Sequence, residues 1–109
     1  MPYDHDLAQR VRDELGQLPE LVEKKMFGGV GFMVQGNMAC GVHSDNLIVR
    51  VGPDNYRAAL GQPHTRPFDI TGRPMSGWVM VAPKGCEAAS DLRKWVRQGM
   101  EFALSLPAK

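Results

Sequence analysis

The feature that most constrains this chain is an apolar run, KMFGGVGFMVQGNM at residues 25–38, that is interrupted by glycines. Glycine weakens the interior of a β-strand and usually marks a bulge, a bend or the close approach of another backbone. Gly28, Gly29 and Gly31 stand together beside two phenylalanines in this run. The pattern predicts that the run joins and bends the first strands of a sheet, with the aromatic side chains in the core.

The length and charge of the chain limit its class. Its 109 residues match one domain that can build its own core, so we expect a single domain over residues 1–109. Hydrophobic residues make up 43% and charged residues 23%, which indicates a globular protein rather than a disordered or fibrous one. The formal net charge of +1 gives no strong positive field of the kind that drives nonspecific nucleic-acid binding.

No targeting or membrane segment is visible in the sequence. The first residues, MPYDHD, form neither the basic nor the apolar part of a signal peptide, and no window approaches about 18 continuous apolar residues. We therefore expect a cytoplasmic protein. Cys40 and Cys86 would be free thiols in that reducing compartment.

The first half of the chain predicts one helix and a series of strands. Apolar residues at helical spacing predict a helix over residues 4–18, which Asp4 caps and Pro19 ends. Short alternating runs then predict four strands of an antiparallel meander. These strands cover residues 22–27, 30–35, 38–43 and 47–51. Gly36 and Asn37 both tolerate positive φ, so they predict a two-residue hairpin turn between the second and third strands.

The second half predicts two more strands between two helices. Pro53 near a first turn predicts a short helix over residues 53–60. Strands are predicted at residues 68–70 and 77–82, around a turn-rich segment. An apolar stripe predicts a long amphipathic helix over residues 86–106 that packs across the sheet. The order of elements predicts an α+β domain.

Several of these segments also carry a family resemblance. The sequence KMFGGVGF at residues 25–32, followed by Gly36-Asn37-Met38, resembles the N-terminal domain of the TfoX/Sxy family, bacterial regulators linked to natural competence. Weaker support comes from LIVRV at residues 47–51, Pro67-Phe68, Arg73-Pro74-Met75 and Trp78. The resemblance covers most of the chain, and the Met-Phe-Gly-Gly core is its most specific part.

The resemblance implies both a fold and a class of function. The fold is an α+β, two-layer domain in which an antiparallel sheet of about five to six strands packs against N- and C-terminal helices, similar in outline to type III secretion chaperones. The function is regulatory and acts through protein–protein interaction, because the family offers no catalytic residue or cofactor to carry over. Longer family members have a second domain of helix-hairpin-helix character that this sequence lacks. The role of competence activator is therefore not carried over with the fold.

Two ligand-binding interpretations of the motifs fail on spacing. Gly28, Gly29 and Gly31 match neither the Walker pattern nor the G-x-G-x-x-G fingerprint of phosphate-binding loops. Cys40 and His43 are three residues apart on a predicted strand, so their side chains point to opposite faces and do not share a metal ion. We therefore expect neither a cofactor nor a metal site.

Cys86 is the basis of an alternative hypothesis, in which the protein has an enzymatic function. The sequence predicts it near the start of the last helix, where the helix dipole lowers the pKa of a thiol, and Lys84 is two residues away. Glu87 opposes this effect, and no second cysteine lies nearby in the sequence. A thiol-based redox protein or an enzyme that uses Cys86 is thus one alternative hypothesis.

A weak nucleic-acid-binding module is the other alternative. Six basic residues could converge on one side of the sheet, with Phe68 or Trp78 as a stacking surface. They are Lys24, Lys25, Arg50, Arg57, Arg66 and Arg73. The net charge near zero favours ordinary solvated charges instead, so nucleic acid is not the expected partner.

The preferred hypothesis is a non-enzymatic regulatory or adaptor domain that binds another protein. Its candidate interaction residues belong to the glycine motif and to the late turn-rich segment. They are Phe27, Gly28, Gly29, Arg73, Pro74 and Met75. Free edges of the sheet would also allow a homodimer.

Overall fold

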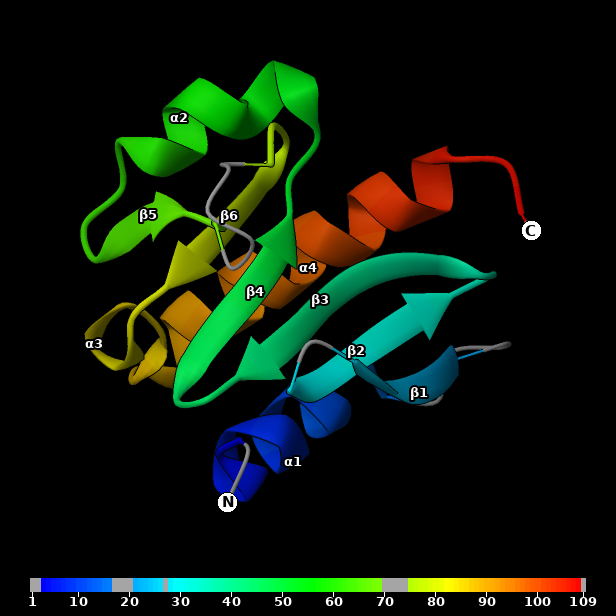
Figure 1. Cartoon of the computed structure of the whole chain (residues 1–109), viewed down its shortest axis with the longest axis horizontal. Coiled ribbons are helices and arrows are strands. Elements are labelled where there is room, and N and C mark those ends of the chain that lie inside the picture. Colours follow the sequence, from blue (N-terminus) through cyan, green and yellow to red (C-terminus); the bar gives the residue numbers. More distant parts are fainter. Residues whose placement is uncertain (1–2, 17–20, 27, 70–74, 109) are drawn as a thin grey trace.

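The computed structural model describes residues 3–16, 21–26, 28–69 and 75–108. An antiparallel sheet lies at its centre, and the N- and C-terminal helices pack against one face of that sheet (Figure 1). The elements are α1 (His5–Leu15), β1 (Leu21–Met26), β2 (Gly29–Val34), β3 (Asn37–His43), β4 (Asn46–Arg50), the 3-10 helix η1 (Pro53–Asn55), α2 (Tyr56–Leu60), β5 (Thr65–Pro67), β6 (Trp78–Val81), α3 (Pro83–Cys86) and α4 (Ala89–Ser105). The predicted α+β, two-layer fold is confirmed.

The six strands lie in the order β1-β2-β3-β4-β6-β5, and each is antiparallel to its neighbours. The first four form the predicted meander, and each begins one residue earlier than predicted. The strand β6 pairs with β4 and carries the short strand β5 on its other side. The two edges of the sheet are therefore β1 and β5.

The turn between β2 and β3 lies one residue earlier than predicted. Gln35 and Gly36 form it, with φ of 53° and 83°, the two positive values that a tight hairpin turn requires. Asn37 is instead the first residue of β3, and its side chain is only 2% exposed. Its amide donates a hydrogen bond of 2.9 Å to the carbonyl of Pro107. The prediction of a Gly36-Asn37 turn is wrong because Asn37 anchors the segment that follows α4.

The large core lies between the sheet and the helices. Its buried strand residues come from β2, β3, β4 and β6 and lie on one face of the sheet; Phe32 and Val49, for example, are both 0% exposed. The helix α4 crosses behind β3 and β4 in Figure 1 and supplies Trp95 to this core. It approaches closely because residue 99 is glycine: a Cβ there would lie 2.3 Å from the backbone oxygen of Ala39. This face of the sheet is therefore sealed by closely packed helices.

Two helix boundaries differ from the prediction. The helix α1 ends at Leu15, where Gly16 adopts a φ of 66°, whereas the sequence predicts a helix to residue 18; residues 17–20, including the expected stop at Pro19, lie outside the described residues. The predicted long helix is α4, which begins at Ala89 rather than at residue 86, and Cys86 instead ends the separate short helix α3. The guanidinium of Arg10 donates hydrogen bonds of 3.1 and 2.9 Å to the carbonyls of Cys86 and Glu87. These contacts from α1 satisfy the backbone at the break.

The strand β5 lies at Thr65–Pro67, three residues before the predicted strand at residues 68–70. Its proline suits an edge strand, because an edge position does not need the missing N–H. Phe68 follows it and is buried against the sheet at 5% exposure. Ile70 lies outside the described residues. The predicted short helix is confirmed as η1 followed by α2, and the strand predicted at 77–82 as β6.

Candidate functional site

The second face of the sheet has a different cover. Successive side chains of a strand alternate between faces, so the neighbours of the large-core residues form a second hydrophobic cluster there. It consists of Met38, Ile48, Phe68 and Met80, all at most 7% exposed. Among the described residues no helix side chain belongs to this cluster. We call this side the helix-free face.

Partly exposed apolar side chains border the second cluster. Val22 is 48% and Met75 41% exposed, and Met33 and Trp78 are half-buried against the cluster. Val22 pairs with Met33 across β1 and β2, and the backbone N–H of Trp78 donates to the carbonyl of Met75 at 3.0 Å. We call these four residues the exposed strip. The register places Met38 and Arg50 between these two pairs. Partly exposed apolar side chains on one surface are typical of a binding surface, and methionine adapts its shape to different partners.

Cations lie on the helix-free face beside the strip. Strand alternation places Lys24, Arg50 and Arg66 there. The guanidinium of Arg50 lies 5.1 Å from the ring centre of Trp78 and 5.3 Å from that of Phe102 on α4. The guanidinium of Arg66 contacts the sulfur of Met80 at 3.2 Å. Both arginines therefore pack on apolar or aromatic side chains of the domain.

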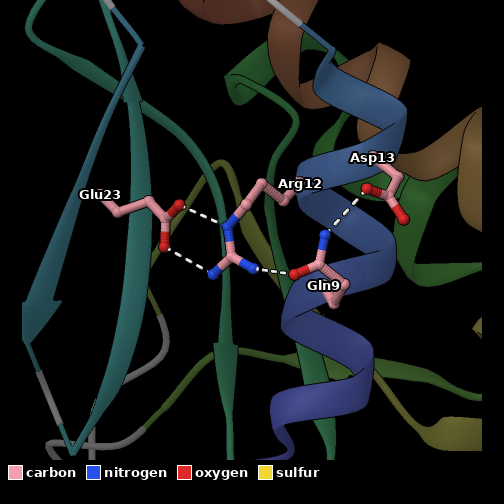
Figure 2. A network of polar contacts seen from close by, with 4 residues as sticks. All are labelled: Gln9, Arg12, Asp13 and Glu23. Atoms are coloured by element: carbon pink, nitrogen blue, oxygen red, sulfur yellow. Dashed lines mark hydrogen bonds and ion pairs between the residues drawn. The ribbon is translucent and has the colours of Figure 1, made fainter.

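Arg12, on the helix-covered side of the sheet, forms an ion pair instead of packing on apolar side chains. Arg12 on α1 reaches Glu23 on β1 with two hydrogen bonds of 2.5 and 2.8 Å, and Gln9 accepts a third (Figure 2). The hydrogen bond from Arg12 lowers the pKa of the Glu23 carboxyl, and Glu23 raises the pKa of Arg12 in return. Both side chains are about one-third exposed, at 37% and 35%, so solvent weakens the attraction. This ion pair ties the edge strand β1 to α1.

The structure separates the predicted interaction residues. Gly28 is exposed with a φ of 74°, which favours glycine. Gly29 is buried, and a Cβ on it would lie 1.9 Å from the backbone oxygen of Val42, so its role is to allow β2 and β3 to approach. Phe27, Arg73 and Pro74 lie outside the described residues. Met75 belongs to the exposed strip, and its interaction role stays a prediction.

Val22 and Met33 were absent from the sequence-based candidates. Met33 follows the core residue Phe32, so strand alternation alone places it on the opposite face. Val22 pairs with Met33 across β1 and β2, so it lies on the same face as Met33. The missing signal was the position of the helices: the sequence does not say which face they cover.

Cys86 lies three residues before α4, so it is near the start of the last helix as predicted but outside that helix. It is the last residue of the short helix α3, before α4 begins, and is 2% exposed. Burial raises the pKa of its thiol to about 11 and that of Cys40 to about 12. Beside Cys86 lies a hollow of about 200 Å³ lined by charged groups such as Arg10 and Asp45. A thiol with a raised pKa is a poor nucleophile at neutral pH, which counts against the redox alternative.

Of the six basic residues proposed for nucleic acid, Lys24, Arg50 and Arg66 share the helix-free face, whereas the other described ones lie elsewhere. Lys24 and Lys25 are neighbours on β1 and point to opposite faces, and Arg57 lies on α2. Arg73 lies outside the described residues. A hollow of about 530 Å³ follows α4, but Lys94, Arg97 and Glu101 give it mixed charge.

The structure does not bring Cys40 and His43 together as metal ligands. Cys40 points into the large core, while His43 takes the next position after Val42 and faces the other way. Among the described residues no group of three or more His, Cys, Asp or Glu side chains could hold a metal ion. In the same part of the chain, no helix is long and apolar enough to cross a membrane.

A comparison with protein-family models shows to which family this chain belongs. The protein-family model of the TfoX N-terminal domain matches residues 13–103, most of the sequence. The chain belongs to the TfoX N-terminal domain family. The resemblance given by the glycine motif is therefore confirmed, and the TfoX N-terminal family is not known as enzymatic. Neither the curated proteins nor the solved structures gave a significant match.

Proposed function

We propose that this TfoX N-terminal domain is a non-enzymatic regulatory or adaptor domain that binds another protein through the exposed strip. The observation that supports it is the unequal cover of the sheet: helices seal one face, whereas Val22 and Met75 on or beside the other remain 48% and 41% exposed. A partner that covers such side chains gains about 25 cal/mol for each Å² of apolar surface removed from water. The strip joins side chains from β1, β2 and β6 with Met75, which lies three residues before β6, so several elements of the fold hold it in place.

The strip supports binding better than catalysis. It offers aliphatic, thioether and indole groups, none of which acts as a general acid, a general base or a nucleophile in ordinary enzymes. The two thiols of the domain are buried. The chemistry of the exposed strip is therefore that of recognition.

The test is capture of partners from the native host with the purified domain as bait. We expect Val22→Thr combined with Met75→Gln to reduce the retained complex about tenfold or more, because each change replaces a buried apolar contact by a polar group. Val22→Thr keeps a β-branched residue in the strand, and Met75→Gln keeps the length of the side chain. Circular dichroism and denaturant unfolding check that both variants fold.

Leu104→Gln is the matched control. Leu104 lies on α4 and is 43% exposed, so the change removes a similar exposed apolar group at a distance from the strip. The proposal requires that this variant retain the complex. A complex that survives the double change in the strip, or is lost equally in the control, contradicts the proposal.

A further inference from the structure

The charges of the sheet are divided unequally between its faces. In the six described strands the single acidic residue is Glu23, which points toward α1 and is held by Arg12. At the described strand positions the helix-free face carries the cations Lys24, Arg50 and Arg66, of which Arg50 also reaches Phe102 on α4, and no carboxylate. The exposed strip therefore lies in a locally basic surface, although the chain as a whole is close to neutral.

Two of these cations lie on the two edge strands of the sheet. Lys24 on β1 and Arg66 on β5 belong to one cross-strand row, which passes through Gly31, Gly41, Ile48 and Met80. Five steps between neighbouring strands of about 4.8 Å place their backbones about 24 Å apart. Val22 stands two residues from Lys24 and Trp78 two residues from Met80, so the exposed strip follows the adjacent row between these cations.

Within the described part of the chain, Arg50 and Arg66 have no acidic partner of the kind that Arg12 has on the other side. Among the described residues the ion pairs are Arg12 with Glu23 and Arg93 with Glu14. Arg66 packs on Met80, and Arg50 packs between two aromatic rings. Guanidinium groups on apolar surface are suited to bind a carboxylate in a partly desolvated place, where a charge-assisted hydrogen bond is stronger.

The same contacts favour a protein partner over a nucleic acid. A base needs a free aromatic face for stacking, and Arg50 covers a face of Trp78. The other members of the exposed strip, Val22, Met33 and Met75, are aliphatic or thioether side chains. These suit apolar side chains of a protein better than the planar bases of a nucleic acid.

We infer that the partner of this surface is an acidic protein segment whose large apolar side chains cover the exposed strip and whose carboxylates face Lys24 and Arg66. This inference rests on the proposed function and adds the chemistry of the partner. A separation of about 24 Å corresponds to a helix of about 16 residues or an extended segment of about seven. The segment therefore has acidic residues toward both ends and apolar residues between them.

The first experiment selects ligands without a bias for charge. A library of peptides with about 16 random positions, displayed on phage, is selected on the wild-type domain and sequenced. We expect the enriched peptides to carry net negative charge and at least two large apolar residues. Enrichment of neutral or basic peptides, or no enrichment, overturns the inference.

The second experiment measures the enriched peptide against charge variants by fluorescence anisotropy. Lys24→Gln with Arg66→Gln should weaken binding about fivefold to tenfold, because two partly screened charge contacts are lost. Lys94→Gln with Arg97→Gln removes the same charge from α4 and should leave the affinity unchanged. Equal loss in both double variants overturns the inference, because it would show only a general effect of net charge.

A third arm tests the nucleic-acid alternative with single-stranded DNA of about 20 nucleotides. DNA that binds more tightly than the peptide and depends on Lys24 and Arg66 overturns the inference in favour of a nucleic-acid surface.

The proposed function is judged separately, by the complex captured from the native host. If that complex needs Val22 and Met75 but survives Lys24→Gln with Arg66→Gln, the protein-binding function stands and the acidic partner is rejected.

Discussion

The two faces of the sheet use neighbouring residues of the same strands in different ways. Phe32 on β2 is 0% exposed beneath the helices, whereas Met33, the next residue, is half-buried on the face that they leave free. The helix-covered face gathers the larger core, and the helix-free face adds a smaller cluster with an exposed border. The comparison suggests that stability depends mainly on the first face and recognition on the second. Substitutions that alternate along one strand separate the two properties.

The largest effect is expected for Phe32→Ala. Removal of a fully buried aromatic side chain costs about 3–5 kcal/mol, because the lost burial is followed by a cavity that the helices cannot fill. Urea or guanidinium unfolding measures the change. Met33→Ala on the same strand is the control and should cost about 1 kcal/mol. Similar losses in both variants would remove the distinction between the faces.

A smaller effect is expected for Ile48→Ala, the fully buried residue of the second cluster. We expect a loss of about 2–3 kcal/mol, toward the lower end for a buried isoleucine, because the methionines around the site adapt to the space. The measurement is again the free energy of unfolding. A loss as large as that of Phe32→Ala would show that the helix-free face carries an equal share of the stability.

The smallest effect concerns the ion pair between Arg12 and Glu23. The hydrogen bond lowers the folded-state pKa of Glu23, so its contribution is present above the unfolded pKa of about 4.3 and is lost as the pH falls through the folded value. Because both groups are partly exposed, Glu23→Gln should cost about 0.5–1 kcal/mol at pH 7. Unfolding curves of wild type and variant should converge at a pH below the folded-state pKa of Glu23. A difference that persists at that pH would mean that the contribution is not ionic.

Local patterns predicted the meander well. Alternation of apolar residues and short turns located all four strands within one residue at their starts, because each pattern repeats over several positions. The turn at Gln35 and Gly36 was missed by one residue, since both Gly36 and Asn37 tolerate positive φ. What decides between them is the hydrogen bond from Asn37 to Pro107, a contact across 70 positions.

The errors later in the chain have the same kind of cause. The break between α3 and α4 depends on Arg10, which binds carbonyls 76 and 77 residues away. The prediction of an activated Cys86 depended on an unbroken helix from that residue. The exposed strip also required knowledge of which face α1 and α4 cover, and alternation within a strand is the same for either choice.

The burial of both thiols turns them into reporters of motion. Cys40 lies beneath the helices and Cys86 at the end of α3, so a thiol reagent modifies either one only during an opening of the native domain. Pulse labelling followed by mass spectrometry would read the two openings separately and without an added probe. Faster labelling of Cys86 than of Cys40 would measure partial unfolding of the α3 segment, and equal rates would show that the domain opens as one cooperative unit.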